Sequence, residues 1–229
     1  MLTDISIIIP VAGLGKRMKA YGPKAAISIS KQDTVLTRQI KILNTFFPKA
    51  NIIVVCGFQK EKIYELLDDN IKCVENKKYK ESNICLSIKI GLNFLKNKKL
   101  LIINGDLVFS DEIFINMPKN YSWAAIDTNL NQRSSEVGVN IVDNVITNFC
   151  YGLTPKWGHI VYLTGNELNM FKQIISKDTS DRKFSFEILN ELIDKGGLIK
   201  PQINKKWKLI EIDTSKDISR AKKLVWRKS

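Results

Sequence analysis

Short apolar segments that alternate with amphipathic helical segments constrain the fold of this 229-residue chain more than any other feature. The segments 5–11, 51–56 and 100–103 lack a clear alternation of polar and apolar residues, which indicates strands that are buried on both faces. Between them, segments 34–46 and 82–95 place apolar residues at helical spacing. Strands separated by helices of this length predict an α/β, Rossmann-like fold, with a mostly parallel sheet and helices on both faces.

The second half of the chain is less regular. Residues 137–142 and 145–149 predict a hairpin that turns at Asp143-Asn144. Further elements are expected as strands at 72–75, 123–126, 160–163 and 209–213 and as helices at 61–67, 167–175, 184–193 and 218–226. No long linker or repeat interrupts this order, so we expect a single domain over residues 1–229.

Composition narrows the class of protein. The chain has 36 Lys+Arg against 23 Asp+Glu, a formal net charge of +13, which invites a nucleic-acid-binding interpretation. Thirty of these basic residues are lysines spread along the chain, which is more typical of a solvated surface than of base recognition. No apolar run approaches the length of a membrane span, and Asp4 precedes the first one, so neither membrane insertion nor a secretory signal is expected.

Four cysteines agree with a cytoplasmic location. Cys56, Cys73, Cys85 and Cys150 are scattered and form no C-x-x-C pair. This spacing indicates reduced thiols rather than a zinc site or a disulfide framework.

Ligands of such folds bind beyond the carboxyl ends of the strands, which draws attention to the loop after the first strand. This loop reads Ala12-Gly-Leu-Gly-Lys-Arg-Met18, and Pro23-Lys24 follows closely. A dinucleotide fingerprint would need a third glycine where Met18 stands, and a Walker A loop would need Gly at Pro10 and Ser or Thr at Arg17. Two glycines with nearby positive charge suit a polyphosphate.

The same residues match the nucleotidyltransferase signature A-G-x-G-x-R-M followed by P-K, with Pro10-Val11 where Leu-Ala is more usual. The chain therefore resembles the small sugar-phosphate and alcohol-phosphate nucleotidyltransferases, and most of all the CTP:phosphocholine cytidylyltransferase-like members. The resemblance extends from about residue 7 to 223 and is weakest between 110 and 200. It implies transfer of NMP, with CMP favoured, from an NTP to a small phosphorylated acceptor, with release of pyrophosphate.

The resemblance also implies roles for charged residues. Arg17 and Lys24 would be catalytic, holding the triphosphate and the reacting phosphates. Asp106 of the Asn104-Gly-Asp tip and Asp213 of a late E-I-D-T motif would bind Mg²⁺, a cation that prefers carboxylates. The alternatives are a turn-forming role for Asp106 and a helix-capping role for Asp213.

The nucleotide site implied by the resemblance draws on three regions. They are the loop, the end of the second strand and the start of the helix at 82–95, where Ser87 to Leu92 fits an S-x-x-x-G-L pattern near the base. Ser82-Asn83 has a helix cap as its alternative role. The expected nucleotide-binding residues are Ala12, Gly13, Leu14, Gly15, Lys16, Arg17, Lys24, Gly57, Ser82, Asn83, Ser87 and Asp106. Residues up to about 110 would then form a nucleotide-binding half, and the remainder an acceptor-binding half.

Other side chains leave the acceptor undecided. His159 is the only histidine, which excludes the H-x-G-H class of cytidylyltransferases, and we interpret it as structural. Trp123, Tyr151, Trp157 and Tyr162 would suit an aromatic box for a quaternary ammonium group, but core packing is the more common use of such residues. A sugar-1-phosphate enzyme that uses another NTP, and a basic nucleic-acid-binding protein, remain alternatives, and a homodimer is left open.

Overall fold

The computed structural model describes residues 5–15, 18, 21–128 and 135–226 of the chain. A central sheet has the strand order β10-β6-β9-β4-β1-β2-β3, and a hairpin of β7 and β8 pairs with β9. Its strands are β1 (Ser6–Pro10), β2 (Asn51–Cys56), β3 (Lys72–Glu75), β4 (Lys99–Ile103), β6 (Trp123–Asp127), β7 (Val137–Val142), β8 (Val145–Tyr151), β9 (Lys156–Thr164) and β10 (Lys200–Ile203). A small second sheet pairs β5 (Leu107–Phe109) with β11 (Leu209–Glu211).

The predicted mostly parallel sheet is confirmed. Along the main path of the sheet, β3, β2, β1 and β4 are parallel neighbours, and so are β6 and β10. β9 lies between β4 and β6 and is antiparallel to both, so in the part of the chain that the structure describes it is the one reversed strand on this path. The carboxyl ends of β1, β2 and β4 therefore meet at one edge of the sheet.

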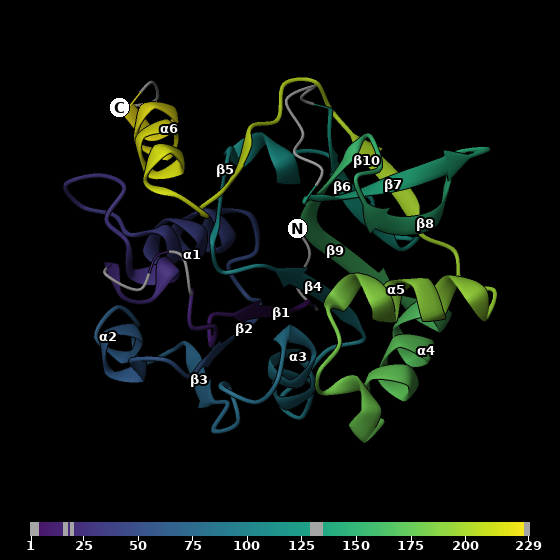
Figure 1. The fold of residues 1–229 in the computed structure, drawn as a ribbon, viewed down its shortest axis with the longest axis horizontal. Coiled ribbons are helices and arrows are strands. Elements are labelled where there is room, and N and C mark those ends of the chain that lie inside the picture. Colours follow the sequence, from purple (N-terminus) through teal and green to yellow (C-terminus); the bar gives the residue numbers. More distant parts are fainter. Residues whose placement is uncertain (1–4, 16–17, 19–20, 129–134, 227–229) are drawn as a thin grey trace.

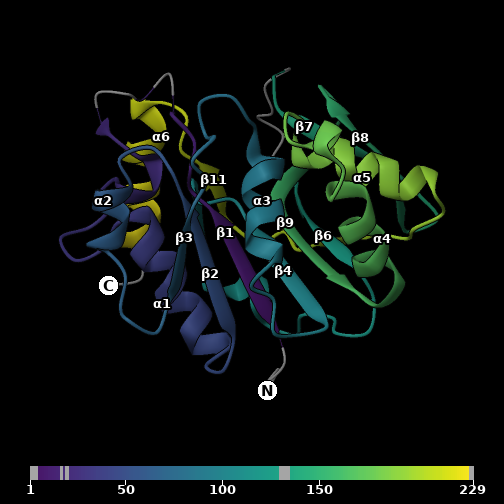
Figure 2. The same ribbon diagram turned by 90° about the horizontal axis from the view of Figure 1, so that it is seen from below.

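Helices cover both faces of the sheet, as predicted (Figures 1 and 2). They are α1 (Val35–Phe46), α2 (Lys60–Tyr64), α3 (Ile84–Leu92), α4 (Gly165–Ile175), α5 (Ser185–Asp194) and α6 (Ser215–Trp226). Figure 2 shows α1 and α6 on the opposite side of the molecule from α4 and α5. None of the described helices is both long enough and apolar enough to cross a membrane.

The core explains why the first strand lacks a polar face. Ile7 and Ile9 pack into one hydrophobic cluster with Leu36 of α1, and Ile8 packs into another with Ile88 of α3. All of these side chains are fully buried, so apolar residues are required at consecutive positions of β1. Thr34 caps α1 and accepts a hydrogen bond from the Thr37 backbone N–H, as the sequence predicts.

Two strands were not expected from the sequence. β10 reads Lys200-Pro-Gln-Ile203 and lies at the edge of the sheet, where a proline without an N–H donor is tolerated. β5 has three residues and directly follows the Asn104-Gly-Asp106 tip. Both segments are too short to show a periodic pattern.

Candidate active site

A cavity of about 400 Å³ opens at the carboxyl ends of β1 and β4 and at the start of α3. Its walls include these residues that the sequence indicates for nucleotide binding: Ala12, Gly13, Leu14, Gly15, Lys24, Ser82, Asn83, Ser87 and Asp106. Lys16 and Arg17 lie outside the described residues. The structure brings these nine residues together from four separate segments of the chain, whereas Gly57 is not among the lining residues.

Backbone hydrogen bonds to β2 and the residues after it fix the start of the loop that follows β1. Val11 donates its backbone N–H to the carbonyl of Val55, and the Ala12 carbonyl accepts from the Phe58 N–H. Gly15 has a φ of +52°, a conformation that favours glycine, and a Cβ added there would lie 3.3 Å from the Lys24 Cγ. A Cβ added at Gly13 would meet nothing within 4 Å, so its backbone is accessible from the cavity.

Gly57 packs behind the cavity wall rather than on its surface. A Cβ at this position would lie 2.9 Å from the Tyr79 Cβ and 3.0 Å from the Ala12 Cβ. Its absence lets Tyr79, which does line the cavity, approach the loop. Gly57 itself is not among the residues that line the cavity, and its expected contact with the nucleotide stays a prediction.

The Asn104-Gly105-Asp106 tip is pressed against the loop. A Cβ at Gly105 would lie 2.2 Å from the Val11 Cγ1 and 2.9 Å from the Pro10 carbonyl oxygen, so a side chain does not fit. On the other side, Gln39 of α1 donates from Nε2 to the carbonyls of Asn104 (2.9 Å) and Leu107 (2.6 Å). This buried amide holds both ends of the tip, and the sequence pattern does not reveal it.

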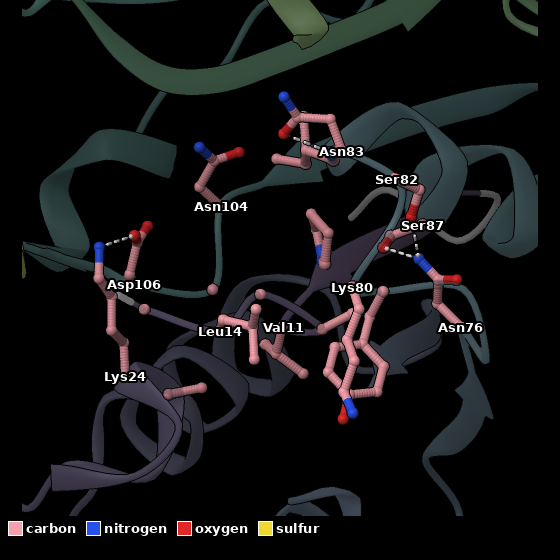
Figure 3. A pocket seen from close by; sticks show the side chains of 18 of the residues that line it. Val11, Leu14, Lys24, Asn76, Lys80, Ser82, Asn83, Ser87, Asn104 and Asp106 are labelled. Carbon is pink, nitrogen blue, oxygen red and sulfur yellow. Dashed lines mark hydrogen bonds and ion pairs between the residues drawn. The ribbon is translucent and has the colours of Figure 1, made fainter. Parts of the chain in front are cut away.

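Lys24 bridges the two aspartates that the sequence analysis identified. Its Nζ lies 2.9 Å from Asp106 Oδ2 and 2.7 Å from Asp213 Oδ1 (Figure 3 shows the first contact). Burial alone would lower the pKa of Lys24, but the charge of Asp106 and the hydrogen bond to Asp213 outweigh it and raise that pKa above its ordinary value. Lys24 is therefore a permanent cation at the mouth of the cavity.

The contacts of Asp106 and Asp213 bear on their alternative roles, while metal binding by both stays a prediction. Capping at the start of α6 is carried out by Asp217, whose Oδ2 accepts from the backbone N–H groups of Asp213 (3.3 Å) and Thr214 (2.9 Å). The carboxylate of Asp213 faces Lys24 instead. Asp106 does end a tight turn, yet its carboxylate also reaches the same ammonium group.

A third carboxylate, missed in the sequence, completes the cluster. One oxygen each of Asp106, Glu211 and Asp213 lie within 4.8 Å of one another. Three half-buried carboxylates suit a hard divalent cation such as Mg²⁺, which takes oxygen ligands. Glu211 and Asp213 are two residues apart at the end of β11, and this spacing is the signal that could have identified Glu211.

The opposite end of the cavity is organised by Asn76, another residue that the sequence analysis missed. Asn76 is 1% exposed and donates from Nδ2 to the hydroxyls of Ser82 (3.2 Å) and Ser87 (3.1 Å; Figure 3). Asn83 is the N-cap of α3, as its alternative role predicted, and it also lines the cavity. Tyr79, Lys80 and Phe184 add an aromatic and basic rim.

The aromatic box is wrong for most of its proposed members, because they belong to the core. Trp123 and Tyr162 are fully buried and stack on each other with ring centroids 5.9 Å apart, and Trp157 is 2% exposed. Tyr151 is 49% exposed and contacts Phe186.

Comparison with known proteins supports the resemblance seen in the sequence. No family model matches the chain. Two curated relatives from Methanococcus maripaludis strains, each named "Bifunctional protein GlmU", are 32% identical over 109 residues and 30% identical over 146 residues. These matches cover 46% and 62% of this chain but only 26% and 34% of the relatives' own length.

Solved structures cover nearly the whole chain. The inositol-1-phosphate CTP transferase of T. maritima has a TM-score of 0.80 at 15% identity, covering 98% of this chain and 96% of its own. The CTP:phosphocholine cytidylyltransferase LicC of Streptococcus pneumoniae has a TM-score of 0.77 at 18% identity, covering 97% and 99%. A nucleoside-diphosphate-sugar pyrophosphorylase of Vibrio cholerae has a TM-score of 0.73 at 12% identity, covering 95% and 99%.

The names of these similar proteins span CTP-dependent and sugar-nucleotide enzymes, and their sequence identities are low, so the likeness concerns the fold rather than one substrate. The sequence motif, the sheet topology and these structures agree with one another. The chain therefore has the nucleotidyltransferase fold, and its resemblance to the small nucleotidyltransferases is confirmed.

Proposed function

We propose that this protein is a Mg²⁺-dependent nucleotidyltransferase that transfers NMP from an NTP to a small phosphorylated acceptor and releases pyrophosphate. The observation that carries the proposal is the convergence of Lys24, Asp106 and Asp213 at the mouth of a cavity whose other wall is a glycine loop. The loop offers backbone N–H groups to phosphates, and the charged cluster lies next to it.

The reaction requires positioning and charge neutralisation rather than a strong base. A phosphate oxygen of the acceptor attacks the α-phosphorus of the NTP, forming one P–O bond, while the bond to the β-phosphate oxygen breaks and pyrophosphate leaves with the electron pair. Lys24 would hold the α-phosphate or the acceptor phosphate through its permanent charge, and Arg17 would hold the β- and γ-phosphates. Asp106, Asp213 and Glu211 would hold Mg²⁺, which supplies charge neutralisation on the triphosphate.

CTP is the nucleotide that we favour. Support comes from the cytidylyltransferase-like motif around Ser87 and from two similar structures whose names specify CTP. Ser87 is 3% exposed and lines the cavity, and its hydroxyl is oriented by Asn76, as a group that reads a base should be. The alternative is a sugar-1-phosphate enzyme with another NTP, which the nucleoside-diphosphate-sugar pyrophosphorylase of Vibrio cholerae favours.

The two halves of the chain suggest a division of labour. Residues up to about 110 provide the loop, the start of α3 and the Asp106 tip, and would bind the nucleotide. The segment from 111 onward adds β9, α5 and the end of β11, and would bind the acceptor. Phe184 brings this second half to the cavity, where Asn83 donates its backbone N–H to the Asp181 carbonyl.

A pyrophosphate-release matrix tests the proposal. CTP, UTP, GTP, ATP and dTTP are each combined with a panel of phosphorylated alcohols, amines and sugars in the presence of Mg²⁺. We expect turnover with at least one pair, with CTP preferred, and loss of roughly 10²–10³ in rate for Asp106→Asn. The matched control is Asp178→Asn, because the Asp178 side chain is fully exposed and pairs with Lys89 outside the cavity.

The outcomes separate the parts of the proposal. Turnover with a nucleotide other than CTP would replace the base assignment and keep the reaction. Wild-type turnover in Asp106→Asn would remove the site assignment. The transferase function would be rejected if no pair releases pyrophosphate while a cooperative thermal unfolding transition shows that the protein is folded.

A further inference from the structure

His159 lies where strand β9 departs from regular pairing. From Ala124 to Ile126, β6 advances by two residues while its partners in β9, Val161 and Trp157, are four residues apart. Within this bulge His159 has a φ of +55°, a left-handed conformation that is uncommon outside glycine. Such backbone strain persists only where the surroundings enforce it, and it occurs preferentially at functional sites.

The bulge aims the imidazole between the carboxylate cluster and the cavity wall. Its Nε2 lies 3.4 Å from Glu211 Oε2, and its Nδ1 lies 3.3 Å from the side-chain Nδ2 of Asn104. The ring also packs on Trp157, with centroids 4.6 Å apart, and the His159 side chain is 12% exposed. The imidazole of His159 thus lies between Asn104 and Glu211 and contacts both.

The contacts of the imidazole indicate how these three groups are arranged. A carboxylate only accepts, so a proton on Nε2 would face Glu211, which lies at ion-pair distance. In a neutral ring Nδ1 then carries a lone pair and accepts from the Asn104 amide nitrogen. Since the nitrogen of that amide is committed to His159, its oxygen is turned the other way, and Figure 3 shows it pointing toward the Asn83 side of the cavity.

We propose that His159 is a positioning residue that fixes the side-chain amide of Asn104, so that Asn104 Oδ1 accepts a hydrogen bond from a hydroxyl or amine N–H of a bound substrate. Asn104 lines the cavity two residues before Asp106, and its backbone carbonyl is anchored by Gln39, so the amide has little freedom besides rotation. This inference rests on the proposed transferase function for its substrate, but the His159–Asn104 geometry can be measured without turnover.

The first test is the tautomer of the imidazole. Because His159 is the only histidine, tag-free protein labelled with ¹⁵N-histidine gives the NMR signals of a single ring. We expect the tautomer with the proton on Nε2, and a change in the Nδ1 shift when Asn104→Ala removes its donor. The assignment would be overturned by a proton on Nδ1, by a doubly protonated ring, or by an Nδ1 chemical shift that does not change in Asn104→Ala.

The second test is a pair of variants that both tolerate the left-handed backbone. His159→Asn keeps an acceptor oxygen near the Nδ1 position, whereas His159→Gly removes the side chain. With the best substrate pair, we expect His159→Asn within about twofold of the wild type, and His159→Gly with a KM raised roughly five- to tenfold for one of the two substrates. The substrate whose KM rises is the one that Asn104 contacts.

Controls separate a positioning role from a structural one. Both variants are compared by thermal unfolding, and the same rise in KM is expected for Asn104→Ala, with no further rise in the double variant Asn104→Ala/His159→Gly. Equal KM values for His159→Gly and His159→Asn would reject the positioning role. If the wild type gives no turnover, the proposed function fails on its own, and the tautomer measurement still decides the geometry.

Discussion

Replacement of Lys24 by methionine is the perturbation that most directly probes the charged cluster. Met keeps an unbranched stem of similar size and removes the ammonium group that lies 2.9 Å from Asp106 and 2.7 Å from Asp213. The variant leaves Asp106, Glu211 and Asp213, with carboxylate oxygens within 4.8 Å of one another, without this counter-charge. We therefore expect Lys24→Met to be less stable than the wild type and to bind Mg²⁺ more tightly.

The size of both effects follows from burial and distance. Unit charges about 4 Å apart interact by roughly 1 kcal/mol in water and about 4 kcal/mol near a protein surface. The Lys24 side chain is 17% exposed and the two aspartates about a fifth exposed, so the contacts are partly screened. After desolvation is subtracted, we expect a loss of about 1–3 kcal/mol in stability without Mg²⁺. Removal of a unit positive charge beside a divalent cation should raise Mg²⁺ affinity by roughly tenfold or more.

Thermal unfolding and calorimetric titration measure these quantities. A loss of about 1–3 kcal/mol lowers Tm by roughly 2–12 °C for a domain of this size, and saturating Mg²⁺ should close most of that gap. The matched control is Lys89→Met, because Lys89 also bridges two aspartates, Asp178 and Asp181, each at 3.1 Å. Lys89 lies away from the cavity, so its loss should leave Mg²⁺ affinity unchanged.

One result would refute this reasoning. If Lys24→Met binds Mg²⁺ no more tightly than the wild type, and Mg²⁺ stabilises both proteins equally, the carboxylates that Lys24 bridges are not the metal site. Turnover adds a second criterion, since loss of the Lys24 charge should lower the rate roughly 10²–10³-fold even at saturating Mg²⁺.

Three further predictions concern the supports of the site and the second half. Gln39→Leu removes two buried hydrogen bonds to the tip and should destabilise the protein by about 1–3 kcal/mol in urea unfolding. Gly105→Ala places a methyl group against Val11 Cγ1 and should reduce the free energy of unfolding by about 1–3 kcal/mol, and a second substitution, Val11→Ala, should restore part of this loss. Full wild-type stability in the single variant would contradict the close approach. Lys177 and Lys183 lower the pKa of Glu191, so Glu191→Gln should reduce the free energy of unfolding by about 0.5–1 kcal/mol at neutral pH. The lysines stabilise only the ionised carboxylate, so the stability difference between variant and wild type should vanish as pH falls below the ordinary Glu range.

Residues that directly follow buried strands could be predicted from the sequence. Gly13 and Asp106 come after β1 and β4, and parallel neighbours end at the same edge of a sheet, so local pattern and one topological rule sufficed. Asp213 needed the family resemblance, because the short strand before it has no clear periodicity. Lys24 was also identified by its motif, but its bridge between the two carboxylates depends on chain segments 82 and 189 residues away.

Residues set by tertiary packing could not be predicted in this way. His159 reaches the site because β9 bulges where it lies between β4 and β6, and no local pattern encodes that strand order. Phe184 reaches the cavity because its segment is tied to Asn83 through the Asp181 carbonyl. Gln39 is a polar residue on the buried side of an amphipathic helix, and its role becomes visible only once the Asn104 carbonyl is placed beside it.

The net charge of the whole chain and the local charge at the site have opposite signs. The net charge of +13 attracts anionic substrates at long range, as expected for nucleotides and phosphorylated acceptors. At the cavity mouth, however, the three carboxylates are met by two described ammonium groups, with Lys24 on Asp106 and Asp213 and Lys156 on Glu211. Lys156 also pairs with a fourth carboxylate, that of Glu136, so the local balance among these groups is negative. A bare triphosphate would be repelled at this point, whereas a triphosphate that arrives with a divalent cation would be accepted. Steering should therefore weaken with added monovalent salt, while binding at the cluster should depend on Mg²⁺, and the two dependences can be separated by measuring NTP association rates at fixed Mg²⁺ and varied KCl.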